Sequence, residues 1–316
     1  MRLASALGAL AVVAVAGCAG IAWQSPLERD HPLAGRVWDV AAAGFIPPRT
    51  LEAALATRHY VLLGEKHDNA DHHALQARLL RALVEAGRRP AVAFEMLTTD
   101  RRDAIARQLA SDPKNSDALA DTVDWKRSGW PDFRLYRPIV RVALDAGLPV
   151  LAANISVATA RALARGDTSM LDPALTAAYA LDRPPSADML AAMTAELREA
   201  HCGQISARLV DGMVAAQRAR DAQMAAALLG AGPDGAVLIA GTGHVRRDRG
   251  VPAYLRAREP EASMASVAFL EVRPERTAPG DYAVLWGGAL PFDYVWFTPR
   301  VDNRDPCEAF RVPRPA

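Results

Sequence analysis

The sequence predicts an α/β protein with a mostly parallel sheet that helices flank, and with a smaller helical lobe inserted into this core. Short apolar runs of strand length recur along the chain, and segments with helical spacing separate them. Apolar strands that alternate with helices are typical of parallel sheets covered on both faces. Residues 156–229 break this alternation, because they are rich in Ala, Leu, Met and Arg and contain no convincing strand.

The first 18 residues have the pattern of a secretory signal. Arg2 precedes a short apolar run, and no other charge occurs before Glu28. The sequence Val-Ala-Gly-Cys, which ends at Cys18, resembles the bacterial lipobox. We therefore predict a signal peptide over residues 1–17 and lipidation of Cys18. An uncleaved membrane anchor is the alternative, since the uncharged stretch is nearly long enough to span a bilayer.

Either alternative exports the rest of the chain. Cleavage after residue 17 leaves 299 of the 316 residues, enough for one large domain or two modest ones. We expect a lipid anchor in a bacterial membrane, with the outer membrane favoured and the domain facing the periplasm or the surface. The 37 basic and 36 acidic residues leave no basic surplus, so nucleic acid is not an expected partner.

The elements of the core follow in order along the chain. Residues 59–64 form an apolar run that predicts a buried strand, and residues 72–86 carry leucines at helical spacing before Gly87. Residues 136–146 predict another helix. Further apolar runs predict strands over residues 90–95, 148–154, 235–241 and 267–272, and an added edge strand over 282–286. We assign residues 30–155 and 230–300 to the α/β core, 156–229 to the helical lobe and 301–316 to a tail.

Two cysteines remain if Cys18 carries lipid. They are Cys202 in the helical lobe and Cys307 in the tail. In an oxidising compartment such a pair predicts a disulfide, which would join the tail to the lobe. Two buried free thiols are the alternative.

Carboxylate and imidazole side chains gather where predicted strands end. Glu65 and His67 follow the first core strand, Glu95 ends the second, and His244 follows the strand over 235–241. Ligands of parallel sheets bind beyond the carboxyl ends of the strands. Glu and His are metal ligands and acid–base groups. We predict that these four residues converge at one site; the alternative is that each is a helix cap or a solvated loop residue.

Two further groups of polar residues lie on predicted helices. His72 and Gln76 are four residues apart and share one helix face, whereas His73 points about 100° away from His72. We therefore expect His72 rather than His73 to face the site. A second group interrupts an apolar stripe in the helical lobe and consists of Gln217, Arg220 and Asp221. These three either pair with one another or project into a cleft, where Arg220 would suit a carboxylate.

Short motifs of this chain occur in the order found in the ChaN family. The sequence resembles that family over nearly the whole mature chain, through segments 64–67 (Gly-Glu-Lys-His), 72–76, 94–96, 125–136, 201–203, 213–221, 241–244 (Gly-Thr-Gly-His) and 250–252. ChaN-like proteins are described as iron-regulated, haem-binding lipoproteins. The wider superfamily includes Tiki proteases and erythromycin-esterase-like hydrolases.

The resemblance implies an α/β core with a smaller helical lobe, and haem as the ligand in iron or haem acquisition. The residues implied in haem binding are Glu65, His67, His72, Gln76, Glu95, Gln217, Arg220, Asp221 and His244. A homodimer is a further expectation. Covalent haem attachment is not expected, because the sequence contains no Cys-x-x-Cys-His motif.

The resemblance does not specify the iron ligand. Haem iron can be held by His, Tyr, Met or Cys. The motif histidines are His67, His72 and His244, and Tyr136 and Tyr254 lie near motifs. The residues that could supply apolar walls are Trp130, Phe133 and Met213.

Two functions therefore fit the sequence, and whether the protein is an enzyme stays open. The first is non-enzymatic haem binding, which the resemblance favours. The second is hydrolysis, in which Glu65, His67, Glu95 and His244 would bind a divalent metal ion or activate water directly.

Overall fold

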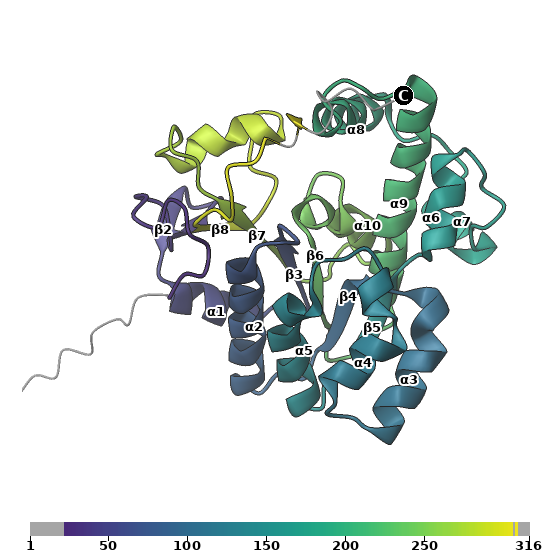
Figure 1. Cartoon of the computed structure of the whole chain (residues 1–316), viewed down its shortest axis with the longest axis horizontal. Helices are drawn as coiled ribbons and strands as arrows, with labels where there is room; N and C mark the ends of the chain where they lie inside the picture. The colour runs from purple at the N-terminus through teal and green to yellow at the C-terminus, as the bar shows by residue number, and fades with distance from the viewer. Residues whose placement is uncertain (1–21, 306, 309–316) are drawn as a thin grey trace, which may run out of the picture.

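The structure is a computed structural model that describes residues 22–305 and 307–308 (Figure 1). The predicted signal peptide and Cys18 lie outside the described residues. Eight strands form one sheet in the order β2-β1-β8-β7-β3-β6-β4-β5. Their bounds are Val37–Asp39 (β1), Gly44–Ile46 (β2), Tyr60–Glu65 (β3), Ala91–Thr98 (β4), Val150–Asn154 (β5), Ala236–Gly241 (β6), Met264–Glu271 (β7) and Tyr294–Thr298 (β8).

Most strand pairs in this sheet are parallel. β3 pairs in parallel with β6 and β7, β4 with β5 and β6, and β7 with β8. β1 pairs antiparallel with β2 and β8. Every residue of β3 and β6 is buried, which explains why both segments are apolar runs rather than alternating ones. The predicted fold class is confirmed.

Helices cover both faces of the sheet (Figure 1). Successive residues of β3 point to opposite faces, so Leu63 joins the core that contains Leu79 of α2, and Leu62 joins the core that contains Leu228 of α9. The helices are α1 (Pro48–Ala56), α2 (Ala70–Glu85), α3 (Arg102–Ser111), α4 (Ser116–Thr122), α5 (Phe133–Asp145), α6 (Val157–Ala164), α7 (Pro173–Tyr179), α8 (Ala187–Ala200), α9 (Ala207–Leu229) and α10 (Val251–Arg258).

Residues 156–229 fold as α6 to α9 and contain no strand. The helix α9 belongs to both parts of the molecule. Val214 in its first half packs in a small cluster with Met193 of α8, whereas Met224 and Leu228 pack on the sheet. Polar residues in the middle of α9 are therefore held close to the edge of the sheet.

One predicted element is wrong. Residues 282–286 do not form an edge strand, because they lie in η4, a 3-10 helix over Pro279–Trp286. A short apolar run has the same pattern in a buried strand and in a buried helical turn. The place beside β7 is taken by β8, which the sequence pattern did not reveal. The short strands β1 and β2 were also not predicted.

The predicted disulfide is present in the structure. Cys202, in the loop after α8, is joined to Cys307 in the tail, with a Cα–Cα distance of 5.6 Å. The tail is thereby held against the helical lobe. In the described part of the chain, no helix is both long and apolar enough to cross a bilayer.

Candidate functional site

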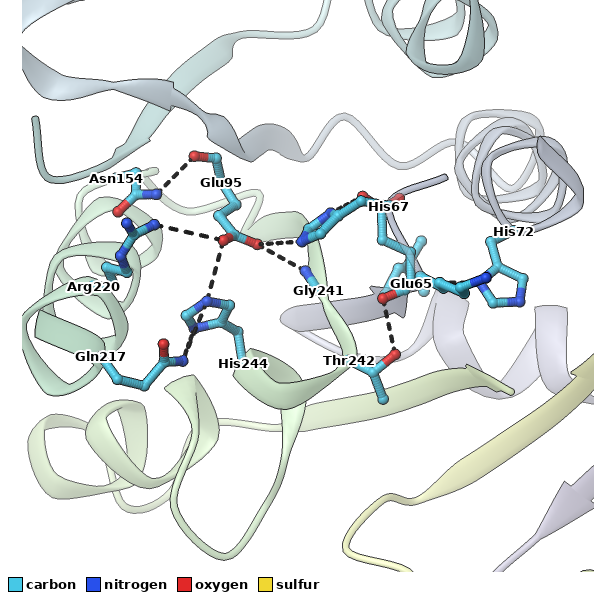
Figure 2. Close-up of polar contacts among 12 residues, drawn as sticks. Glu65, His67, His72, Glu95, Asn154, Gln217, Arg220, Gly241, Thr242 and His244 are labelled. Atoms are coloured by element: carbon cyan, nitrogen blue, oxygen red, sulfur yellow. Dashed lines mark hydrogen bonds and ion pairs between the residues drawn. The ribbon is translucent and has the colours of Figure 1, made fainter. Parts of the chain in front are cut away.

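Three neighbouring strands position the candidate site at the carboxyl edge of the sheet. β6 lies between β3 and β4. Glu65 ends β3, Glu95 lies in β4, and His244 lies in the 3-10 turn η3 (Thr242–Val245) directly after β6. Figure 2 shows that their side chains converge, together with His67 and with Gln217 and Arg220 of the middle of α9, and Asp221 of the same helix contacts His244. We call these residues the strand-end cluster: Glu65, His67, Glu95, Gln217, Arg220, Asp221 and His244.

Glu65 is buried and orients His67. Its Oε1 atom accepts hydrogen bonds from the Tyr136 hydroxyl and from Nδ1 of His67, both at 2.9 Å. Its Oε2 atom lies 2.7 Å from Nε2 of His73. Because Nδ1 of His67 donates to Glu65, the other ring nitrogen of the neutral imidazole keeps a lone pair that can accept a proton or bind a metal ion. This nitrogen, Nε2, lies 3.9 Å from Oε2 of Glu95.

Glu95, His244 and Asp221 form a second chain of contacts. Nε2 of His244 lies 3.2 Å from Oε1 of Glu95, and Nδ1 lies 2.6 Å from Oδ1 of Asp221. The other Glu95 oxygen accepts the backbone N–H of Gly241 at 2.8 Å. Arg220 lies 3.9 Å from Glu95. One imidazole is thus held between two buried carboxylates.

The side chain of Gln217 also reaches His244, because its amide nitrogen lies 3.0 Å from Nδ1 (Figure 2). The polar residues of α9 therefore do not only pair with one another. They contact Glu95 in β4 and His244 after β6. This agrees in part with the alternative that these residues project away from their own helix towards a site.

Small residues make the close packing of the cluster feasible. A Cβ atom on Gly241 would lie 2.9 Å from Nε2 of His67. A Cβ atom on Gly64 would lie 2.3 Å from Cγ2 of Val245, so η3 could not pack against β3. Thr242 adds a hydrogen bond from its hydroxyl to the carbonyl oxygen of Glu65.

The expectation that His72 rather than His73 faces the site is wrong. His72 is fully buried, accepts the backbone N–H of Lys66 at Nδ1, and contacts the Thr298 hydroxyl at Nε2. His73 instead contacts Glu65. The helix α2 begins at Ala70, after the N-cap Asn69. The rotation of α2 about its own axis decides which of the two adjacent histidines contacts the cluster, and spacing along the sequence does not reveal that rotation.

Gln76 also lies away from the cluster. It donates from Nε2 to the carbonyl oxygen of Leu63 inside the core. The structure thus brings seven of the nine predicted site residues together. The other two contact strands of the sheet instead, Gln76 at β3 and His72 at β8.

Sequence reasoning did not identify Tyr136, His73 and Asn154 as partners of the cluster. Tyr136 of α5 is fully buried between Glu65 and the ring of His73, 4.2 Å away between centroids. Asn154, at the end of β5, donates to the backbone carbonyl of Glu95. The end position of Asn154 on a predicted strand was the one signal available for it.

The contacts set the charges of the cluster. Burial alone would raise the pKa of Glu65, but His73 and His67 lower this pKa to about 2. Burial alone would lower the pKa of His244, but the negative charges of Glu95 and Asp221 raise this pKa to about 10. Burial raises the pKa of Asp221 to about 6 against the charge of His244. The pKa of Glu95 is lowered by His244 and His67 despite burial.

His67 is the imidazole of the cluster with solvent access. About a third of its side chain is exposed, whereas the side chain of His244 is 8% exposed. Trp130 packs edge-on against its ring, with centroids 4.8 Å apart. Burial lowers the pKa of His67, but the hydrogen bond to Glu65 and the charge of Glu95 raise it overall. Among the described residues, no group of three or more His, Cys, Asp or Glu side chains is arranged to hold a metal ion.

Comparison with known proteins gives a family match. The family described as "Haem-binding uptake, Tiki superfamily, ChaN" matches residues 51–255. No curated protein matches the chain. The matched range contains the whole strand-end cluster.

One solved structure shares the fold, and two others are less similar. ChaN of Campylobacter jejuni, described with cofacial haem binding, superposes with a TM-score of 0.65 at 19% identity, over 82% of this chain and 95% of that one. A type III effector, HopBA1, gives a TM-score of 0.41 at 14% identity, over 79% and 92% of the two chains. An erythromycin esterase mutant in its open conformation gives a TM-score of 0.45 at 14% identity, over 81% of this chain and 95% of that one.

Proposed function

This chain belongs to the haem-binding uptake family ChaN of the Tiki superfamily, and on that premise we propose that it binds haem in iron or haem acquisition. The family match carries the proposal. It spans residues 51–255 and therefore includes every element that builds the strand-end cluster.

The cluster has the chemistry that a haem group needs. His67 presents a partly exposed imidazole whose Nδ1 is held by Glu65, so that Nε2 points away from Glu65 and lies 3.9 Å from Glu95. Trp130 provides an aromatic surface beside it. Arg220 is partly exposed, and its guanidinium can bind a propionate. When bound, haem supplies an iron atom that takes a side-chain nitrogen or oxygen as an axial ligand.

The buried imidazoles are poor candidates for that ligand. His72, His73 and His244 each make close polar contacts inside the protein. Tyr136 is fully buried, and burial and Glu65 raise its pKa. His67 is therefore the residue that would hold the haem iron. Titration of the protein and its His67→Ala variant with haem, followed by the Soret band, tests this assignment.

We also propose that Cys18 carries lipid. The described part of the chain begins at residue 22, and the backbone N–H groups of Gln24 and Ser25 donate to the Asp71 carboxylate at the start of α2. The four peptide steps from Cys18 to Ala22 span at most about 14 Å. The lipid would therefore hold the folded domain directly against a membrane surface.

A hydrolase is the second candidate function, because one observation favours it. Glu65 and His67 form a carboxylate–imidazole pair at 2.9 Å, with a partly exposed imidazole, as a general base and its orienting group require. His67 would accept a proton from water at Nε2, and the positive charge of Arg220 would stabilise negative charge on the substrate. Hydrolysis of p-nitrophenyl esters that is lost in His67→Ala would support this function, and turnover equal to the buffer blank would exclude these esters as substrates.

A further inference from the structure

A cavity of about 960 Å³ lies beside the strand-end cluster at the same edge of the sheet. Most of its lining residues come from η4 and from the ends of β3, β7 and β8 and the segments after them, and Thr242 after β6 also lines it. In Figure 1 the turn η4 belongs to the yellow-green helical segment beside β7 and β8. Parallel sheets bind ligands at this edge.

The cavity is separate from the cluster. Glu65, His67, Glu95 and His244 do not line it. Lys66 and Thr242 do, and they stand between the two spaces: Lys66 directly follows Glu65, and Thr242 donates to the Glu65 carbonyl. A molecule in the cavity would therefore not contact His67.

One wall of the cavity is apolar and aromatic. Phe269 at the end of β7 and Tyr282, Leu285 and Trp286 of η4 form it. Val284, also in η4, is 69% exposed, more than the other large apolar side chains of the described chain. The turn η4 thus presents apolar surface both inside the cavity and, at Val284, to solvent.

The other lining residues include five acids and four bases, and three of the acids form ion pairs. Lys66 forms ion pairs with Asp68 and Glu271, and Arg304 forms one with Asp302. The guanidinium groups of Arg273 and Arg300 make no ion pair or hydrogen bond with described residues. Among the lining acids, the Glu308 carboxylate is the one that also makes none with described residues.

A third donor also lacks a partner. Nε1 of Trp286 is buried without a hydrogen bond in the described part of the molecule. Burial of an N–H group without an acceptor costs about 1–3 kcal/mol, which an oxygen atom of a ligand would recover. The unpaired groups that line the cavity are thus mainly donors.

The tail closes the cavity. Asp302, Arg304 and Glu308 line it, and the disulfide between Cys307 and Cys202 holds this part of the tail against the helical lobe. The roof of the cavity is therefore fixed covalently to the loop between α8 and α9.

We propose that this cavity is a second binding site, which takes an amphipathic carboxylate. Arg273 and Arg300 bind the carboxylate, the indole N–H of Trp286 donates to an oxygen atom of the ligand, and the apolar body packs on Tyr282 and Leu285. This site does not depend on the proposed haem binding, since it shares none of the haem-contacting side chains.

The test is a titration of the protein with 11-(dansylamino)undecanoate, a fluorescent carboxylate with an apolar chain. We expect saturation at one probe per chain. Substitution of both Arg273→Gln and Arg300→Gln should raise the Kd at least tenfold, and Trp286→Phe should raise it severalfold. The double variant Arg107→Gln with Arg161→Gln removes two exposed charges outside the cavity and should change the Kd less than twofold, as should His67→Ala.

Two results would overturn the proposal. One is binding that does not saturate, or that both double arginine variants weaken equally while circular dichroism shows both folded. The other is stoichiometric displacement of the probe by haem in the wild type but not in His67→Ala, which would assign the probe to the haem site. Haem binding is measured separately by its Soret band, so failure of either site is recognised independently.

Discussion

His244 and Asp221 are joined by a contact of 2.6 Å between Nδ1 and Oδ1, and this contact links the loop after β6 to the middle of α9. Glu95 contacts the opposite side of the same ring at 3.2 Å. All three side chains are buried, so the positive imidazole is the group that balances two carboxylates.

Removal of that imidazole should destabilise the fold in a pH-dependent manner. His244→Ala leaves Glu95 and Asp221 buried without their shared partner, and we expect a loss of about 3–5 kcal/mol at pH 8. Protonation of either carboxylate relieves the repulsion, so the loss should be smaller at pH 5. Urea unfolding of the variant and the wild type at both pH values measures the difference. An equal loss at pH 5 and 8 would show that the charges are not responsible.

The wild type should lose stability at alkaline pH for the same reason. The pKa of His244 is raised to about 10, above the value of about 6.5 for an unfolded histidine. A raised histidine pKa stabilises the folded state fully below pH 6.5, and this contribution disappears as the pH rises through 10. Melting temperatures between pH 6 and 10.5 should fall in the wild type and change less in His244→Ala.

Glu65 should control the protonation of His67. The hydrogen bond to Glu65 raises the pKa of His67, so Glu65→Gln should lower that pKa towards or below its ordinary value. An NMR titration of the imidazole protons measures it directly. His59→Ala provides an unrelated histidine variant that assigns the signals. An unchanged pKa of His67 in Glu65→Gln would mean that Glu95 sets its charge.

Gly241 should be needed for the site more than for the fold. A Cβ atom at this position meets the His67 ring at 2.9 Å, and that partly exposed ring can move away. We therefore expect Gly241→Ala to weaken haem binding at least tenfold with a small change in melting temperature. In Gly64→Ala the added Cβ meets Val245 and the Thr242 backbone, so a stability loss of about 1–3 kcal/mol is expected. The reverse pattern would contradict the assigned roles.

Cys18→Ser should abolish lipidation. A hydroxyl group cannot replace the thiol that accepts the lipid, and radioactive palmitate labelling of the variant should disappear. Cys202 and Cys307 remain in this variant and are paired with each other. Labelling that persists at the wild-type level would refute the lipoprotein proposal.

The disulfide should stabilise the protein through its long loop. Cys202 and Cys307 are 105 residues apart, and closure of such a loop contributes up to about 4–5 kcal/mol in the chain-entropy model. Cys307→Ser should therefore lower the free energy of unfolding by several kcal/mol. Non-reducing peptide mapping of the wild type should recover the two cysteines in one linked fragment, and recovery of two free thiols would show that the pair is not oxidised.

The sequence was sufficient for features that depend on local patterns. The buried strands β3, β4, β5, β6 and β7 are visible as apolar runs because both of their sides face protein. The convergence of Glu65, Glu95 and His244 was predictable, because carboxyl ends of parallel strands meet at one edge. Two cysteines in a chain that we expect to be exported were enough to predict their pairing.

Only the tertiary structure decided the remaining features. The choice between His72 and His73 depends on how α2 is rotated against β3, and the role of Tyr136 depends on which helix packs beside α2. The turn η4 and the strand β8 have similar apolar patterns, and packing alone assigns one to a helical turn and the other to the sheet. Local propensity acts over a few residues, whereas these contacts join segments that are 70 or more residues apart, such as Tyr136 and Glu65 at a separation of 71.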